Sequence, residues 1–253
     1  MAWDPQLYLS FGAERTRPAA ELLGRVALDA PARVVDLGCG PGNSTALLVA
    51  RWPQAEVEGV DSSPEMLEEA RAAGISARWT CADITSWKSS SRCDVIYSNA
   101  TFQWLPDHAR LLPRLASYLP PNGVLAFQVP SNFGELSHTL IHETVADGPW
   151  AGRLADARMG DVLEGERYFD ILEPHVSQID IWEARYIQVL SGDDAVYRWM
   201  MGTGLRPFAN ALEGDEREAF LAEYRRRVGL AYPMRKSGIT LYPFQRLFCV
   251  ARR

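Results

Sequence analysis

Hydrophobic and polar positions follow two alternating patterns along the first half of the chain. Short apolar runs suited to buried strands occupy residues 32–38, 56–61, 77–83, 93–100 and 123–130. Segments with helical spacing lie between them, at 43–52, 62–74 and 106–119. The helix at 62–74 has a serine cap, Pro64 at its first helical position and a glycine at its end. Strands that alternate with helices at this spacing predict a parallel sheet with right-handed crossovers.

The pattern changes after residue 130. Helices are expected at 136–145, 193–204 and 215–228, and two further strands at 177–190 and 247–253. We therefore expect a single domain over residues 1–253, with an α/β, Rossmann-like, mostly parallel seven-stranded sheet and helices on both faces. Helical insertions at about 131–175 and 190–240 would form a cap over the carboxyl edge of the sheet, where ligands bind in open α/β sheets.

Composition narrows the classes of protein that fit this pattern. Of the 253 residues, 47% are hydrophobic and 23% charged, which is ordinary for a globular protein, and the net charge of −6 argues against nucleic acid as a partner. No apolar run is long enough to span a membrane, and the N-terminus does not resemble a signal peptide. The four cysteines form no C-x-x-C pair. We therefore expect reduced thiols and a cytoplasmic location.

The first expected strand ends in the sequence D-L-G-C-G-P-G, residues 36–42. A G-x-G turn after a buried strand presents backbone amides at a helix N-terminus, ready for a polar or anionic group. The dinucleotide-binding pattern would need a third glycine at position 43, where the chain has Asn43. Asp36 suits a ligand with a cationic amine and suits a pyrophosphate badly. The loop therefore favours a nucleotide that carries an amino acid over NAD.

Two more aspartates stand at the ends of the next two strands. Asp61 is placed to accept hydrogen bonds from both ribose hydroxyls, and Asp83 from an adenine amino group, with Ile84 beside the ring. Each aspartate also has a structural interpretation, as a cap of the following helix or turn. Three aspartates in series, at the carboxyl ends of three successive strands, favour a bound nucleotide.

Together these motifs resemble the class I S-adenosylmethionine-dependent methyltransferases, over at least residues 33–130. The resemblance implies S-adenosyl-L-methionine as cofactor and S-adenosyl-L-homocysteine as product. Asp36 and the glycine loop would hold the methionine moiety, and Asn99 would lie near the sulfonium. The full set of expected cofactor-binding residues is Asp36, Gly38, Gly40, Gly42, Asp61, Ser62, Met66, Asp83, Ile84 and Asn99.

Segments outside the nucleotide-binding core narrow the resemblance. WDPQLYLSFGAERTRPAAELL, RWPQAEVEGVDSSPEM, NATFQWLPDH, TGLRP and RLFCVARR are similar to the bacterial trans-aconitate methyltransferases, nearly end to end. That family esterifies one carboxylate of trans-aconitate, an unsaturated tricarboxylic acid. The resemblance therefore implies a carboxyl O-methyltransferase with a small tricarboxylate as its partner.

The chemistry of such a reaction fits the residues that the chain offers. A carboxylate is ionised at neutral pH and attacks without losing a proton, so we expect no catalytic base and no metal, and catalysis by positioning alone. Arginines suit a ligand with three carboxylates. Pro18 favours an extended backbone before it, which would let Arg15 and Arg17 both point inward. The expected substrate-binding residues are Tyr8, Arg15, Arg17, Trp104 and Arg206.

Alternatives remain for the residues and for the function. Each arginine has the alternative of a surface ion pair, and each aromatic residue that of core packing. A methyltransferase for another small carboxylic acid, or for a carboxyl on an acyl carrier, would use the same cofactor site. A nucleotide-sensing domain and a nicotinamide oxidoreductase fit fewer of the motifs. No helix shows a sustained heptad seam, and we expect a monomer.

Overall fold

The computed structural model describes the backbone of residues 12–253 and the side chains of residues 16–253. Its helices and strands, in chain order, are α2 (Gly12–Gly24), β1 (Arg33–Leu37), α3 (Asn43–Arg51), β2 (Glu56–Asp61), α4 (Pro64–Ala72), β3 (Arg78–Cys81), β4 (Val95–Asn99), η1 (Phe102–Trp104), α5 (His108–Ser117), β5 (Val124–Pro130), α6 (Leu136–Asp147), α7 (Gly165–Leu172), η2 (Glu173–His175), β6 (Gln178–Ser191), α8 (Ala195–Met201), α9 (Arg206–Asn210), α10 (Gly214–Ala231) and β7 (Ile239–Arg252).

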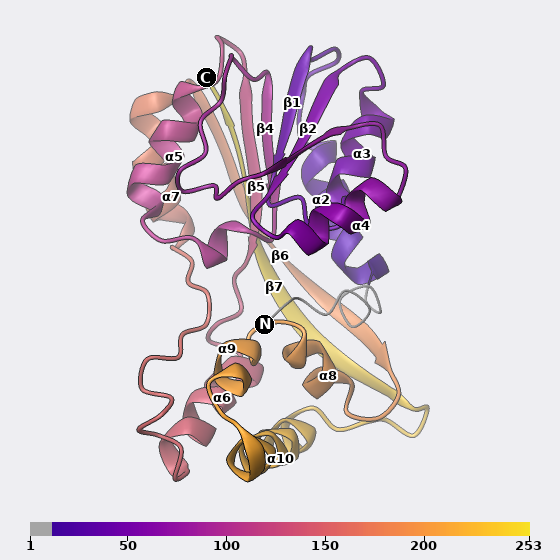
Figure 1. Ribbon diagram of the computed structural model, residues 1–253, viewed down its shortest axis with the longest axis vertical. Helices are drawn as coiled ribbons and strands as arrows, with labels where there is room; N and C mark the ends of the chain where they lie inside the picture. Colours follow the sequence, from indigo (N-terminus) through magenta and orange to yellow (C-terminus); the bar gives the residue numbers. More distant parts are fainter. Residues whose placement is uncertain (1–11) are drawn as a thin grey trace.

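The strands form one seven-stranded sheet in the order β3-β2-β1-β4-β5-β7-β6. The pairs among β1 to β5 are parallel, and β7 enters antiparallel between β5 and β6. Helices α2 and α3 pack against one face, and α5 and α7 against the other (Figure 1). The predicted α/β, Rossmann-like and mostly parallel seven-stranded fold is confirmed.

Strands β6 and β7 continue beyond the sheet as a two-stranded ribbon (Figure 1). Strand β5 pairs with β7 only as far as Pro130 opposite Arg246, whereas the β6–β7 pairing runs on to Ser191 opposite Ile239. The sequence-based strand at 247–253 was therefore too short at its start. The ribbon carries Tyr242 and Phe244 into the apolar core of the cap, where both rings pack against Trp199.

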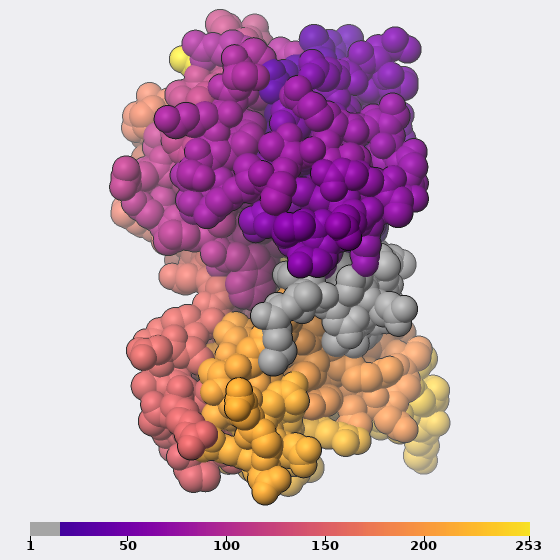
Figure 2. All heavy atoms as spheres, viewed as in Figure 1, coloured from indigo at the N-terminus to yellow at the C-terminus, as the bar shows by residue number. Residues whose placement is uncertain are grey.

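Helices α6, α8, α9 and α10 form a cap beyond the carboxyl edge of the parallel strands, and Figure 2 shows the outline of the molecule narrowing between sheet and cap. The cap has a separate apolar core that includes Trp150, Phe208 and Phe220. The first predicted insertion, 131–175, extended too far. Helix α7 packs against α5 instead, because Tyr168 and Leu172, four residues apart on one helical face, are buried in the core of the sheet.

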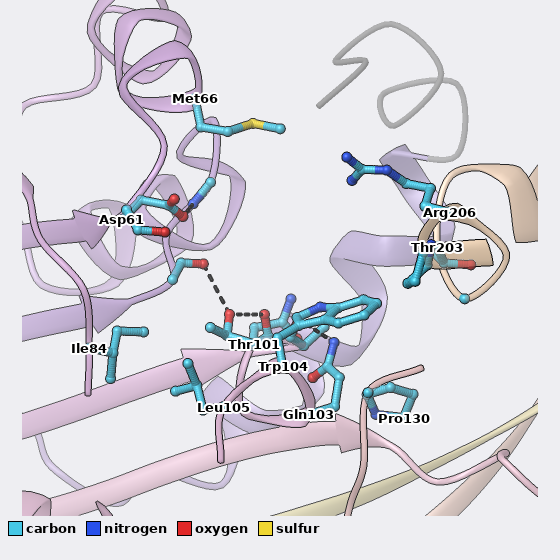
Figure 3. A pocket seen from close by; sticks show the side chains of 18 of the residues that line it. Asp61, Met66, Ile84, Thr101, Gln103, Trp104, Leu105, Pro130, Thr203 and Arg206 are labelled. Carbon is cyan, nitrogen blue, oxygen red and sulfur yellow. Dashed lines mark hydrogen bonds between the residues drawn. The ribbon is translucent and has the colours of Figure 1, made fainter. Parts of the chain in front are cut away.

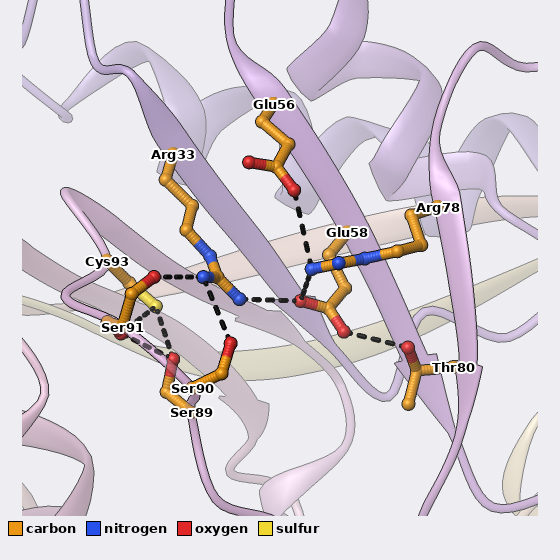
Figure 4. A network of polar contacts seen from close by, with 9 residues as sticks. All are labelled: Arg33, Glu56, Glu58, Arg78, Thr80, Ser89, Ser90, Ser91 and Cys93. Carbon is orange, nitrogen blue, oxygen red and sulfur yellow. Dashed lines mark hydrogen bonds and ion pairs between the residues drawn. The ribbon is translucent and has the colours of Figure 1, made fainter.

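A polar network on β2 ties the first three strands together (Figure 4). Glu58 is 5% exposed, and its Oε2 accepts from Arg33 Nη2 at 3.0 Å and from Arg78 Nη2 at 2.7 Å. Its Oε1 accepts from Thr80 Oγ1 at 2.7 Å. Burial alone would raise the pKa of Glu58, but the hydrogen bonds from Thr80, Arg78 and Arg33 outweigh it and lower that pKa.

Candidate active site

A cavity of about 420 Å³ lies between the carboxyl edge of the sheet and the cap. Residues that follow the parallel strands line one half, and residues of the cap and of β7 line the other. In Figure 3, Asp61 and Met66 enter from the strand side, Thr203 and Arg206 enter from the cap side, and the ring of Trp104 lies between them. The first half is called the strand half below, and the second the cap half.

The glycine loop after β1 borders the strand half. Gly38, Gly40 and Gly42 all have positive φ, at 74°, 54° and 92°. The amide of Gly40 donates to Asp61 Oδ2 at 2.9 Å, so the aspartate after β2 holds the loop in place. A Cβ added at Gly40 would meet no atom of the described residues within 4 Å. This part of the loop therefore faces open cavity, where a ligand can approach the main chain closely.

Gly42 was predicted to bind the cofactor, but it is not among the residues that line the cavity. A Cβ at Gly42 would lie 2.7 Å from Ile75 Cδ1 and 3.0 Å from Trp79 Cη2. Its left-handed conformation precedes the first residue of α3. Close packing against α4 and β3 therefore requires a glycine at this position.

Asp36 also lies outside the cavity lining, fully buried beneath the loop. Its Oδ2 accepts from Ser44 Oγ and from Thr45 Oγ1, both at 2.7 Å, whereas Oδ1 has no partner among the described residues. Burial raises the pKa of Asp36 to about 6, although the hydroxyls of Thr45 and Ser44 oppose that shift. Ser44 in turn lines a smaller cavity of about 30 Å³ beside the loop. A cationic group on the loop would compensate for this buried carboxylate.

Asp61 and Asp83 both line the cavity and also cap the turns that follow them. Asp61 Oδ1 accepts from the amide of Ser63 at 2.9 Å. Asp83 Oδ1 accepts from the amide and from the hydroxyl of Thr85, both at 2.7 Å, and these bonds lower its pKa. Asp83 Oδ2 has no partner among the described residues. Both carboxylates therefore keep lone pairs that can accept hydrogen bonds from a ligand, in addition to those that they accept from the turns.

Eight of the ten predicted cofactor residues line the cavity, and the two that do not are Asp36 and Gly42. The eight are Gly38, Gly40, Asp61, Ser62, Met66, Asp83, Ile84 and Asn99. Met66 and Ile84 are buried and supply the apolar part of this wall. An open glycine loop, a buried acidic oxygen that the described residues leave without a partner, and acidic strand ends beside apolar walls fit a nucleotide with an amino-acid arm.

The structure places only some of the predicted substrate-binding residues at the cavity. Trp104 and Arg206 line the cavity. Arg17 does not, because its guanidinium lies over the ring of Tyr186, 4.8 Å from the ring centroid. Helix α2 runs without a break through Pro18, so the backbone before the proline is helical and not extended. Tyr8 and the side chain of Arg15 lie outside the described residues.

The extended backbone expected before Pro18 was wrong. Pro18, Ala19, Leu22 and Leu23 are all buried. They form the apolar stripe of α2, and Leu22 and Leu23 belong to the core on that face of the sheet. Packing of this stripe outweighs the local preference of the residue before a proline.

Sequence reasoning missed Arg246, which is 4% exposed and lines the cap half of the cavity. It lies opposite Pro130, where the β6–β7 ribbon leaves the sheet. A signal was present, because Tyr242, Phe244 and Arg246 alternate with less buried residues at the period of a strand. An arginine in line with two buried aromatic residues is a candidate for function.

His138 was also missed, and it lines the cap half at 5% exposure. Its Nδ1 is hydrogen-bonded to Ser137 Oγ at 3.0 Å. Burial, with the nearby His142, lowers the pKa of His138 to about 4, so the ring is neutral at pH 7. Among the described residues the cap half thus has two arginines and no carboxylate, since Asp61 and Asp83 belong to the strand half.

From residue 12 onward, no helix is both long and apolar enough to cross a membrane. The described residues contain no group of three or more metal-ligating side chains. All four cysteines are free thiols.

The fold and the site define an S-adenosyl-L-methionine-dependent methyltransferase. The methyltransferase domain family matches residues 11–169. "Trans-aconitate 2-methyltransferase" of Azoarcus sp. (strain BH72) is 53% identical and covers 99% of each chain. The protein of the same name from Methylobacterium radiotolerans is 48% identical, over 99% of this chain and 98% of its own. The chain belongs to the trans-aconitate 2-methyltransferase family, as the sequence motifs predicted.

Solved structures are similar in fold at much lower identity. The YcgJ protein of Bacillus subtilis is 14% identical, with a TM-score of 0.62 over 94% of this chain and 98% of that one. Coclaurine N-methyltransferase, bound to N-methylheliamine and S-adenosyl-L-homocysteine, is 16% identical, with a TM-score of 0.55 over 94% of this chain and 72% of that one. At these identities the likeness shows the fold alone.

Proposed function

We propose that this protein esterifies one carboxylate of trans-aconitate, with S-adenosyl-L-methionine as methyl donor and S-adenosyl-L-homocysteine as second product. The observation that carries the proposal is the division of charge in the cavity. Arg206 and Arg246 line the cap half, and the acidic residues of the described lining are confined to the strand half. Guanidinium groups bind carboxylates with paired hydrogen bonds, so the cap half suits an acceptor with several carboxylates.

The residues of the cap half act by binding and orientation. S-adenosyl-L-methionine, when bound, supplies an activated methyl group. The acceptor carboxylate is already ionised at neutral pH, so none of the lining residues has to remove a proton. Burial lowers the pKa of Arg206, which means that its guanidinium is partly shielded from water, and such shielding strengthens its attraction for an anion. Correct placement of two reacting groups is worth about 7–11 kcal/mol, enough for catalysis without a base.

The test is methyl transfer from labelled S-adenosyl-L-methionine to trans-aconitate, cis-aconitate, citrate, isocitrate and a monocarboxylic acid. We expect a clear preference for trans-aconitate. Arg206→Ala should raise KM for it about 10- to 100-fold, as expected for a lost charged hydrogen bond. Arg17→Ala is the matched control and should change KM less than about twofold, because Arg17 lies outside the cavity lining. Equal rates with the monocarboxylic acid, or no transfer to any acid while S-adenosyl-L-homocysteine still binds, would contradict the proposal.

The proposal includes a monomeric enzyme in the cytoplasm. All four cysteines are free, and Cys81 is exposed, which suits a reducing compartment. Sedimentation of the purified protein at several concentrations tests the first part, and fractionation of cells that express it tests the second.

A further inference from the structure

Three polar side chains form a row across the sheet beside the cavity. Arg246 Nη1, on β7, donates to Gln128 Oε1, on β5, at 3.1 Å. Gln128 Nε2 donates to Asn99 Oδ1, on β4, at 3.0 Å. The strand register sets the row, since Asn99 pairs with Gln128 and Arg246 lies two residues before Phe248, the partner of Gln128 on β7. Gln128 is fully buried, so solvent competes little for its bonds.

The arginine fixes the orientation of both amides. A guanidinium donates hydrogen bonds and never accepts them, so Gln128 has to present its oxygen to Arg246 and its NH2 group to Asn99. Asn99 then has to present its oxygen to Gln128. Its own NH2 group is left to point elsewhere. The two ends of an amide have nearly the same shape, and here the charge of Arg246 decides between them.

Asn99 lies in the wall of the cavity, so the orientation of its amide affects a ligand there. Together with Gly38 and Gly40 it lines both the large cavity and the small cavity beside the glycine loop. Within residues 16–253, Asn99 Nδ2 donates to no side chain or backbone oxygen, whereas the backbone oxygen of Asn99 accepts from Thr101 Oγ1 at 3.2 Å. A half-buried NH2 group in the wall of a cavity gains most from an acceptor on the ligand.

We propose that Gln128 is a positioning residue: held by Arg246, it turns the Asn99 NH2 group toward a carboxylate oxygen of the acceptor. This inference rests on the proposed function, because a carboxylate is the acceptor that an amide donor and a nearby guanidinium recognise together. Gln128 itself is absent from the cavity lining, so it acts only through Asn99. With the amide reversed, Asn99 would present an oxygen to the carboxylate and repel it.

Gln128→Glu tests the orientation with little change of volume. The new carboxylate still accepts from Arg246, but it has no NH2 group for Asn99, whose amide is then expected to reverse. We expect KM for trans-aconitate to rise at least about tenfold, the size of a lost hydrogen bond to a charged group. The Kd of trans-aconitate for the enzyme loaded with S-adenosyl-L-homocysteine should rise by the same factor. The kcat value and the Kd of S-adenosyl-L-homocysteine alone should stay close to wild type.

Two further variants separate positioning from folding. Asn99→Asp keeps the oxygen that accepts from Gln128 and replaces the NH2 group by a second, negatively charged oxygen, so it should raise KM for the carboxylate acceptor at least as much. In an Asn99→Ala background, Gln128→Glu should have no further effect on KM, because the group that it reorients is gone. The matched control is Gln188→Glu, the same exchange at a buried position on β6 outside the cavity, which should leave KM unchanged.

The outcomes distinguish this inference from the proposed function. A rise in KM that is confined to the acceptor and disappears in the Asn99→Ala background supports the inference. An unchanged KM in Gln128→Glu, while the wild type methylates trans-aconitate, overturns it and leaves the proposed function intact. A parallel loss of S-adenosyl-L-homocysteine binding and of Tm overturns it as well, because the row would then be structural. If the wild type transfers methyl to no acid, the proposed function fails first, and that result needs no variant.

Discussion

Replacing Asp36 by asparagine is expected to stabilise the protein without cofactor at neutral pH and to weaken cofactor binding. Asp36 is fully buried, and within the described part of the chain only one of its two oxygens has partners, the hydroxyls of Ser44 and Thr45. The ionised carboxylate is therefore costly to bury. Asparagine has nearly the same shape and carries no charge.

The pKa gives the size of the effect. Burial raises the pKa of Asp36 from 3.8 to about 6, and each pKa unit corresponds to about 1.4 kcal/mol. At pH 7 the ionised group therefore costs the folded state about 3 kcal/mol. The NH2 group of asparagine would occupy the position of the oxygen without a partner, at a cost of about 1–2 kcal/mol. The net stabilisation by Asp36→Asn at pH 7 is then about 1–2 kcal/mol.

The pH dependence gives the sharper test. A carboxyl with a raised folded-state pKa binds its proton more tightly when folded, so the cost of Asp36 is complete above about pH 6 and disappears as the pH falls toward 3.8. Between pH 7.5 and pH 5.0 the advantage of Asp36→Asn over wild type should shrink by about 1.5 kcal/mol. Urea denaturation of both proteins at the two pH values measures it, and other titrating groups cancel in the difference.

A control variant keeps the charge and removes a partner. Thr45→Val leaves the carboxyl of Asp36 in place without one of its donors, so it should destabilise the protein, and more at pH 7.5 than at pH 5.0. Calorimetry with S-adenosyl-L-homocysteine should show weaker binding to Asp36→Asn than to wild type. If Asp36→Asn has the same stability difference from wild type at both pH values, the charge of Asp36 is not the cause of that difference.

Two other changes test the strand half and the polar network. Asp61→Asn should weaken S-adenosyl-L-homocysteine binding about 10- to 100-fold, because one of the two amides that the carboxylate holds, at Gly40 and at Ser63, loses its acceptor. Asp83→Asn should weaken S-adenosyl-L-homocysteine binding less than Asp61→Asn does, since one oxygen of Asp83 accepts both bonds from the following turn. Equal losses of affinity for the two variants in calorimetry would contradict this account. Glu58→Gln should lower the free energy of unfolding by about 2–4 kcal/mol in urea at pH 7, because it leaves buried partners uncompensated. The lowered pKa of Glu58 means that this contribution is complete above about pH 4.5 and is lost as the pH falls through the lower pKa of the folded state. A difference from wild type that did not shrink at all between pH 7 and pH 3 would show that the charge is not the cause.

The strand half of the site was predicted largely from the sequence. Its residues follow the strands directly. Each can be recognised from a short sequence motif, such as an apolar run that ends in Asp61 or a glycine turn with Gly38 and Gly40. Parallel strands bring their carboxyl ends to one edge, so short signals were enough to place these residues together. These short motifs do not determine the direction in which a side chain points. Asp36 and Gly42 belong to the same motif, yet they pack inside the protein.

The cap half depended on contacts between distant parts of the chain. Gln128 and Arg246 are 118 residues apart in sequence and meet because β7 is inserted antiparallel next to β5. Arg17 was a reasonable candidate by composition, but the buried stripe of α2 turns it toward Tyr186.

The sequence by itself therefore determined the class of sheet, the nucleotide-binding edge and the family. Tertiary structure alone decided which arginines line the cavity and which way the amide of Asn99 points. The physical reason is the distance in sequence over which each kind of interaction acts. Periodicity and turn chemistry act over a few neighbouring residues, whereas the position of a charged side chain depends on the pairing of strands and on the packing of helix faces that are distant in sequence.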